Sequence, residues 1–289
     1  MFRRTVLTPP MSMYRWTRLS TQRMEEDWYA RLAFIEPEHL VMLTQPGSSA
    51  LKIQVFGDKK TVERLVRDFG GKMTRLSPEV WTGGRTRAPL SIRGRLKVHS
   101  DEASFREADN TMRDLFIPAG MAFGTGDHAT TATCLRLLCD LVDELPTGWR
   151  AMDAGTGTGI LAIAAEKLGA SSIEAFDFDP VCIRVSKENA QANNCRKIEF
   201  AIADSRKVGR FKSAHVILAN LFSELLVASA PGFAKKLHPG GHLIFSGVLR
   251  SQSEEVSRGL QACGFQKPRL VVRGKWCAGI TSLADRARR

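Results

Sequence analysis

From Trp149 to the end of the chain, short apolar runs alternate with segments of helical periodicity. The apolar runs of strand length are WRAMDA, SIEAFDFD, KIEFAIA, AHVILAN, GHLIFSG, PRLVVRG and WCAGITSL. Strands that alternate with helices over short connections form parallel, doubly wound sheets. The last two runs have no helix between them, which predicts an antiparallel hairpin at one edge. The pattern therefore predicts an α/β fold with a doubly wound, seven-stranded, Rossmann-like sheet.

The first third of the chain has a different pattern. Helices are expected near EEDWYARL and DKKTVERLVRDFG, and strands near HLVMLT, LKIQVF and KMTRL. A length of 289 residues also exceeds the usual size of one domain. We therefore predict a small basic α+β domain over residues 1–80, a tether over 81–118 and the large α/β domain over 119–289.

Residues 1–24 contain five arginines, several serines and threonines, and no acid. This composition is typical of an organellar transit peptide; the alternative that we prefer is a frayed basic terminus or a start codon placed too early. No run approaches the ~18 apolar residues of a membrane-spanning helix. We therefore expect a cytoplasmic protein without a membrane partner.

The net charge of +12 is unevenly distributed. Residues 59–97 carry eleven lysines and arginines against three acids. Such a segment could form a face that contacts an anionic partner such as ribosomal RNA, or simply a solvated surface. Aromatic residues are not interleaved with these cations, so the pattern does not favour sequence-specific binding of single-stranded RNA.

The six cysteines form no C-x-x-C pair, and several lie in apolar runs: Cys134, Cys139, Cys182, Cys195, Cys263 and Cys277. We expect reduced thiols in the core rather than zinc ligands or disulfides, and no metal site.

A glycine-rich turn follows the first strand of the large domain, in the order Asp153-Ala-Gly155-Thr-Gly157-Thr-Gly159. Glycines allow a tight turn and a close approach of a ligand at the carboxyl end of the strand. Dinucleotide folds require G-x-G-x-x-G, and here the third glycine comes one residue too early, which excludes a nicotinamide dehydrogenase. G-x-G-x-G preceded by an acid is instead typical of S-adenosylmethionine-dependent methyltransferases. Gly155 and Gly157 are thus candidate cofactor-binding residues.

An acid stands at the end of the second strand. Asp177 lies where a carboxylate can accept hydrogen bonds from both hydroxyls of a ribose. The alternative role, capping the helix that begins at Pro180, fits Asp179 better. We therefore predict that Asp177 binds the cofactor ribose.

Two further polar residues end the next strands. Asp204 is a candidate for binding an adenine amino group or for a role in the turn. Asn220 ends the fourth strand, where its side chain can face the methyl donor or the acceptor. The residues after it are Leu221 and Phe222, so the N-P-P-[FY] pattern of enzymes that methylate bases or planar amides is absent. This absence disfavours a nucleic-acid base as the acceptor.

The segment GMAFGTGDHATT, residues 120–131, precedes the apolar-periodic run ATCLRLLCDLV. It could be a catalytic histidine loop, a phosphate cradle or a lid over a ligand that binds elsewhere. Together with MDAGTGTGILAIAAEKLGA, FDFDPVCIRVSKENAQANN, VILANLFSELL, LHPGGHLIFSGVLRSQSEEV and GKWCAGI, it resembles the ribosomal protein L11 methyltransferase (PrmA) family from about residue 81 onward. The resemblance implies S-adenosylmethionine as cofactor, a lid role for the loop, and cofactor contacts at Thr131, Gly155, Asp177 and Asn220. It favours a pinning role for His128 over that of a catalytic base.

The sequence departs from the family pattern in a few places. Asp127 replaces the usual Thr, Ala129 the usual Pro, and Leu221-Phe222 the usual Ile-Leu. Residues 1–80 match the family's substrate-recruiting domain only in position and in a loose α/β pattern.

The resemblance implies methylation of lysine or N-terminal amino groups on a ribosomal protein, most directly L11, by a monomeric enzyme. No catalytic base stands out. Phe123, Leu221 and Phe222 are candidate walls of a dry pocket, or simple core residues, and a dry pocket would favour the neutral amine. The alternatives are a ribosomal RNA methyltransferase that grips RNA through the basic module and a non-catalytic ribosome-assembly factor that binds the cofactor.

Overall fold

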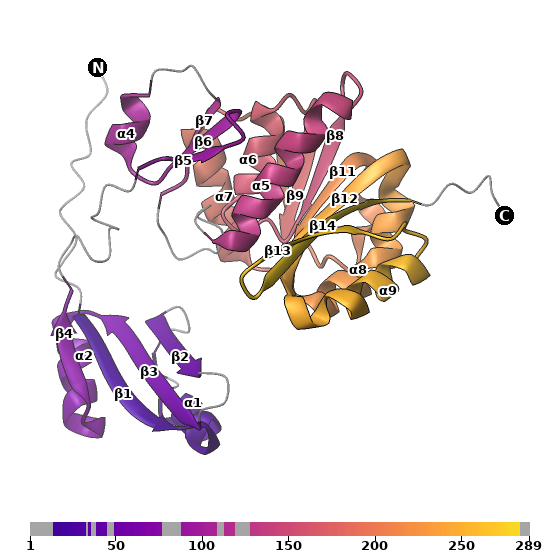
Figure 1. Cartoon of the computed structure of the whole chain (residues 1–289). Helices are drawn as coiled ribbons and strands as arrows, with labels where there is room; N and C mark the ends of the chain where they lie inside the picture. The colour runs from indigo at the N-terminus through magenta and orange to yellow at the C-terminus, as the bar shows by residue number, and fades with distance from the viewer. Residues whose placement is uncertain are drawn as a thin grey trace. The chain divides into compact units, whose positions relative to one another are not determined.

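The computed structural model describes residues 14–32, 34–35, 39–44, 49–76, 88–108, 113–118 and 128–283. The chain divides into two compact units, Met1–Thr86 and Arg87–Arg289. Figure 1 shows a small sheet with helices in the first unit and a large sheet with helices on both faces in the second.

The first unit is a four-stranded antiparallel sheet with the strand order β2-β3-β1-β4. Its elements are β1 (Tyr14–Thr21), α1 (Glu25–Arg31), β2 (Leu40–Thr44), β3 (Ala50–Gly57), α2 (Lys59–Phe69) and β4 (Lys72–Arg75). The core gathers around the fully buried Trp16 of β1, which contacts the rings of Trp28 and Phe69. The indole Nε1 of Trp16 donates a hydrogen bond to the carbonyl oxygen of Gly70 at 2.6 Å.

One sequence expectation is wrong in this unit. Residues 14–24 do not lie outside the fold, because β1 pairs with both β3 and β4 and is followed by a short 3-10 turn, Gln22–Met24. The many arginines of this segment conceal an alternating pattern. Trp16 faces the core while Arg15 and Thr17 belong to the other face of the strand.

The second unit contains the predicted seven-stranded sheet, with the order β10-β9-β8-β11-β12-β14-β13. The strands are β8 (Arg150–Ala154), β9 (Ser172–Asp177), β10 (Ile198–Ile202), β11 (Ala214–Asn220), β12 (Leu237–Leu249), β13 (Arg269–Arg273) and β14 (Trp276–Ser282). Strands β8 to β12 are parallel to one another, and β14 is antiparallel to both β12 and β13. The fold class and the antiparallel edge hairpin predicted from the sequence are confirmed.

Helices cover both faces of this sheet. The helices are α5 (Ala129–Leu141), α6 (Ile160–Lys167), α7 (Pro180–Ala192), α8 (Ser223–Lys236) and α9 (Ser253–Ala262). Side chains of α5 and α6 form one hydrophobic cluster with the sheet, and those of α8 and α9 form another. Figure 1 shows these two layers on opposite sides of the strands.

A third, small sheet lies within the segment predicted to be a tether. It consists of β5 (Leu90–Ile92), β6 (Leu96–His99) and β7 (Arg113–Phe116), with α4 (Glu102–Arg106) between β6 and β7. Its buried side chains join the cluster formed by α5 and α6: Ile92, Leu96, Val98, Leu115 and Ile117. These residues therefore belong to the core of the second unit.

Hydrogen bonds from one helix anchor this small sheet. Asn193, after α7, accepts from the amide of Phe116 and donates to its carbonyl oxygen, each at 2.7 Å. Asn189 donates to the carbonyl oxygen of Thr158 in the glycine-rich turn at 2.8 Å. Helix α7 thus holds both the end of β7 and the turn that follows β8. None of the described helices is long and apolar enough to cross a membrane.

Candidate functional site

The glycine-rich turn after β8 is fastened to the neighbouring strand. The amide of Gly155 donates to the carbonyl oxygen of Phe176 on β9 at 2.9 Å. Gly155, Gly157 and Gly159 have φ angles of 73°, 53° and 83°, which residues with a side chain rarely adopt. A Cβ atom at Gly155 would also lie 2.5 Å from Cδ2 of Leu221. Glycine therefore keeps this turn open for a ligand.

Asp153, the last residue but one of β8, stabilises the glycine-rich turn through hydrogen bonds. Its side chain is fully buried, and Oδ2 accepts from the hydroxyl of Thr156 at 2.7 Å and from the amide of Ala162 at 3.1 Å. Burial raises the pKa of Asp153 to about 7, and the carboxylate of Asp177 adds to the shift. The acid before the glycine motif thus ties the end of β8 to the start of α6.

Asp177 ends β9 beside the turn, and its carboxylate is held in one orientation. Oδ2 accepts from the amide of Gly157 at 3.0 Å, and Oδ1 accepts from the amide of Asp179 at 3.1 Å. Each carboxylate oxygen has a second lone pair, so both can still accept a hydroxyl. The capping role falls to Asp179, whose Oδ1 accepts from the amide of Val181 at 2.8 Å.

Asn220 connects the end of β11 with the start of α5. Its Nδ2 donates to the hydroxyls of Thr130 and Thr131 at 3.4 and 3.3 Å. Its Oδ1 is buried, and no described residue donates a hydrogen bond to it. An unsatisfied buried acceptor is costly, so a ligand with an N–H or O–H donor would be stabilised here.

His128 is the N-cap of α5. Its Nδ1 lies 2.7 Å from the hydroxyl of Thr130, and the amide of Thr130 donates to it at 3.4 Å. The imidazole also meets the ring of Trp276 edge to face, with centroids 5.2 Å apart. These contacts support a pinning role. Residues 120–127 of the predicted lid, including Phe123, lie outside the described residues.

One cavity of about 740 Å³ lies along the carboxyl ends of the parallel strands, within the size range of small-molecule sites. All five residues predicted to bind cofactor line it: Thr131, Gly155, Gly157, Asp177 and Asn220. Leu221 and Phe222 line it as well; Leu221 is buried and Phe222 is exposed.

Asp204 also lines this cavity but is already engaged. Both of its carboxylate oxygens accept from the guanidinium of Arg206, at 2.7 to 3.0 Å, and Oδ1 accepts from the backbone amide of Arg206 at 2.9 Å. The hydrogen bonds from Arg206 lower the pKa of Asp204 to about 2. Of the two roles considered for Asp204, this geometry favours the turn.

Two aromatic residues of the cavity were missed in the sequence. Phe178 directly follows Asp177 and is 77% exposed, and Trp276 begins β14. The position of Phe178 after a strand-ending acid could have indicated it. No local signal could have indicated Trp276, because the hairpin of β13 and β14 brings it to the site from more than fifty residues away.

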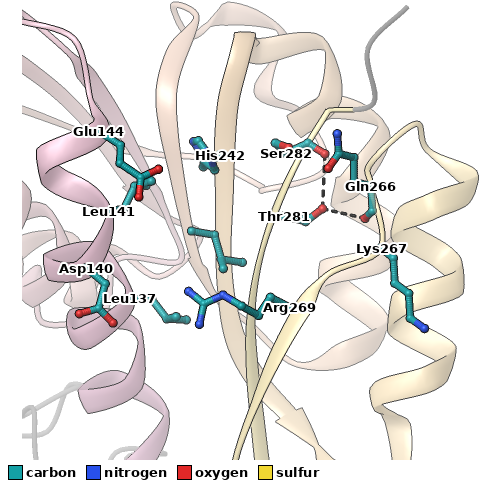
Figure 2. Close-up of a pocket in the computed structure, with 11 residues that line it drawn as sticks. Leu137, Asp140, Leu141, Glu144, His242, Gln266, Lys267, Arg269, Thr281 and Ser282 are labelled. Atoms are coloured by element: carbon teal, nitrogen blue, oxygen red, sulfur yellow. Dashed lines mark hydrogen bonds between the residues drawn. The ribbon is translucent and has the colours of Figure 1, made fainter. Parts of the chain in front are cut away.

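A second cavity, of about 370 Å³, lies between α5 and the strands β12 to β14. Figure 2 shows Asp140 of α5 and Arg269 of β13 facing the same hollow. Asp140 is paired with Arg93 at 2.8 Å, and Thr281 donates to the carbonyl oxygen of Gln266 at 2.7 Å. None of the residues predicted to bind cofactor lines this cavity.

The basic segment is divided between the two units. Residues 59–75 lie in the first unit and residues 93–97 in the second. Several of its cations are paired with acids, in the pairs Lys59–Glu63, Arg64–Asp68, Arg67–Asp68, Arg93–Asp140 and Arg95–Asp143. At least five of the eleven cations are therefore engaged in ion pairs.

Cys134, Cys139 and Cys277 are buried, and burial raises the pKa of each thiol. Among the described residues, no group of three or more histidine, cysteine or acidic side chains could hold a metal ion.

A doubly wound sheet with a G-x-G-x-G turn after β8 and an acid at the end of β9 defines the S-adenosylmethionine-dependent methyltransferase class. The sequence profile of the ribosomal protein L11 methyltransferase (PrmA) family matches residues 73–283. The chain belongs to this family.

Relatives and solved structures agree with this assignment. A ribosomal protein L11 methyltransferase of Bordetella parapertussis is 45% identical over 177 residues, covering 58% of this chain and 55% of the relative. One from Geobacillus thermodenitrificans is 30% identical over 270 residues, covering 88% and 85%. With several curated relatives, the chain spans only about half of the relative's length. The crystal structure of a ribosomal protein L11 methylase from Lactobacillus delbrueckii subsp. bulgaricus is similar, with a TM-score of 0.58 and 26% identity, covering 69% of this chain and all of that one.

Proposed function

We propose that this protein transfers methyl groups from S-adenosylmethionine to amino groups of a ribosomal protein, most directly the large-subunit protein L11. Lysine side chains or the N-terminus would be the acceptors. The observation that carries the proposal is the single cavity that brings together Thr131, Gly155, Gly157, Asp177 and Asn220. Membership of the PrmA family supports the acceptor class.

The cavity fits this cofactor. The carboxylate of Asp177, oriented by two backbone amides, would accept the ribose hydroxyls. The open turn at Gly155 and Gly157 would receive the amino-acid part against the main chain. The unsatisfied Oδ1 of Asn220 would accept from an N–H of the cofactor or of the acceptor. When bound, S-adenosylmethionine supplies an electrophilic methyl group on a sulfonium sulfur.

The chain's own contribution is to position a neutral amine. A free lysine has a pKa of about 10.4, so only about one molecule in a few thousand is neutral at pH 7. The buried side chain of Leu221, beside Asn220, provides an apolar wall that disfavours the ammonium form. The amine that has lost its proton to water would be the nucleophile for the methyl group that S-adenosylmethionine would supply. Positioning supplies most of the acceleration.

The first unit would recruit the acceptor protein. Its separate core allows it to act as an independent binding module beside the catalytic unit. A monomer acting in the cytoplasm is the expected state. The ion pairs on α2 reduce the charge available for an additional contact with ribosomal RNA.

The test is methyl transfer from S-adenosylmethionine that carries a labelled methyl group to separated ribosomal protein and ribosomal RNA fractions. Label is expected in one small ribosomal protein, and Asp177→Ala is expected to abolish most of it at low cofactor concentration. Label in RNA instead would identify a ribosomal RNA methyltransferase. Cofactor binding without transfer to either fraction would identify a non-catalytic assembly factor.

A further inference from the structure

The sheet order determines which groups lie at each end of the large cavity. From β10 to β14, the cavity-lining residues at the carboxyl edge are Asp204, Asp177, Gly155, Asn220, Gly247 and Trp276. With the ribose at Asp177 and the amino-acid part at Gly155, the end beyond Asn220 remains for the acceptor. The inference that Phe222 acts at this end rests on the proposed function.

Phe222 is an unusual residue at this end. Its side chain is 76% exposed although it lines the cavity, and it lies two residues after Asn220 as the N-cap of α8. Only Phe178, at the opposite end of the same cavity, is more exposed among the large apolar side chains of the described chain. The cavity is therefore flanked by one accessible phenyl ring at each end.

The other aromatic group at the acceptor end is already occupied. The ammonium of Lys275 lies 5.3 Å from the centroid of the Trp276 ring, and the imidazole of His128 meets the same indole edge to face. In the part of the chain that the structure describes, no ring and no cation pairs with Phe222. Its face is thus available to a group on the acceptor.

We propose that Phe222 captures the charged amine of the acceptor at the mouth of the cavity before the amine loses its proton. A lysine ammonium is attracted to the face of an aromatic ring, and nearly all lysine is charged at neutral pH. The N-terminus of α8 carries a partial positive charge, which the exposed Glu224 in the first turn of that helix offsets. The captured side chain then moves inward past Leu221 toward Asn220.

Two substitutions separate the ring face of Phe222 from its apolar bulk. Phe222→Leu keeps an apolar side chain at an exposed position, so the fold should accommodate it. Leucine keeps the apolar contact and removes the ring face. The pair of variants Phe222→Leu and Phe222→Tyr therefore separates aromatic recognition from simple apolar packing.

The kinetic test uses ribosomal protein L11 as acceptor at saturating S-adenosylmethionine. Phe222→Leu is expected to raise the KM for the acceptor about two- to fivefold with kcat unchanged, because the lost contact is at an exposed ring and acts before the chemical step. Phe222→Tyr should stay near the wild type. The ratio of the KM values of Phe222→Leu and wild type should fall as the pH approaches about 10.4, where the amine becomes neutral.

Phe178→Leu is the matched control, because it removes a phenyl ring of nearly equal exposure from the cofactor end. It should raise the KM for S-adenosylmethionine and leave the KM for the acceptor within about twofold. If Phe222→Leu leaves the acceptor KM unchanged while wild type transfers methyl groups to L11, the capture role is wrong and the proposed function stands.

A binding test separates the inference from turnover. Phe222→4-fluorophenylalanine provides a fluorine resonance that tetramethylammonium should shift, whereas an equal concentration of potassium should not. A shift with no methyl transfer to any ribosomal protein would contradict the proposed function and leave an aromatic cation site. No shift would overturn the capture role.

Discussion

The two ends of the large cavity differ in the groups that line them: backbone groups dominate at the cofactor end and side chains at the acceptor end. The cofactor end consists of backbone amides, glycines with positive φ angles and the oriented carboxylate of Asp177. The acceptor end carries the unsatisfied Oδ1 of Asn220 and the exposed ring of Phe222. Main-chain geometry permits few substitutions, whereas an exposed side chain can change without disturbing the fold. The fold therefore constrains the cofactor end more tightly than the exposed side chain at the acceptor end.

The largest effect is expected at Gly247, and it tests whether the acceptor end of the cavity tolerates substitutions in its backbone as well as in its exposed side chains. Gly247 has a φ of 85°, and a Cβ atom there would lie 2.4 Å from the backbone oxygen of Leu221. A backbone atom cannot move aside as the end of a side chain can. Gly247→Ala should lower the free energy of unfolding by about 2–4 kcal/mol and abolish methyl transfer. Gly240, in the same strand, has a φ of 73° but no atom within 4 Å of the added Cβ. Gly240→Ala should cost only about 1–2 kcal/mol. Denaturant unfolding of both variants measures the difference in the free energy of unfolding. Equal losses of stability would show that the positive φ angle, and not the contact with Leu221, causes the destabilisation.

An intermediate effect is expected at the cofactor end. Asp177→Ala should weaken the binding of S-adenosylhomocysteine by about ten- to hundredfold, because charge-assisted hydrogen bonds to the ribose are lost. Asp204→Ala should weaken it by less than about threefold, because that carboxylate is already paired with Arg206. Isothermal titration calorimetry compares the two. Equal weakening by both would assign Asp204 a direct role in binding adenine.

The smallest expected effect concerns the support beneath the cofactor end. The folded pKa of Asp153, about 7, lies above the ordinary value of 3.8. Between these values the folded protein holds a proton that the unfolded chain has lost, so this group makes stability fall as the pH rises from about 4 to 7. Asp153→Asn cannot titrate, and its melting temperature should therefore fall less steeply across that window than that of the wild type. If the melting temperatures of the variant and the wild type change equally with pH in this window, the pKa of about 7 for Asp153 is wrong.

The sequence predicted the large sheet and the strands β2, β3 and β4 of the first unit, but it missed β1 and the sheet of β5 to β7, for physical reasons. The strands of the large sheet are buried on both faces, which leaves continuous apolar runs such as AHVILAN. Strand β1 is half-buried and rich in arginine, and β5 to β7 span only three or four residues each. Such strands are stabilised by tertiary packing and leave a weak local signal.

The same distinction applies to the cavity. The glycine turn and Asp177 were predicted because tight backbone geometry and a strand-ending acid leave a signature within a few residues. Trp276 reaches the site only through the pairing of β14 with β12. The buried acceptor on Asn220 depends on where the hydroxyls of Thr130 and Thr131 lie, which no single segment of sequence specifies.

The small sheet of β5 to β7 also determines where this chain could exchange its N-terminal module. Its side chains Ile92, Leu96 and Leu115 are fully buried in the core formed with α5 and α6. A recombination junction after Pro118 would remove these side chains and leave the helices with an uncovered apolar surface. A junction before Leu90 would leave that core complete. The boundary between the catalytic unit and an exchangeable N-terminal module therefore lies before β5, although the sequence of that segment looks like a linker.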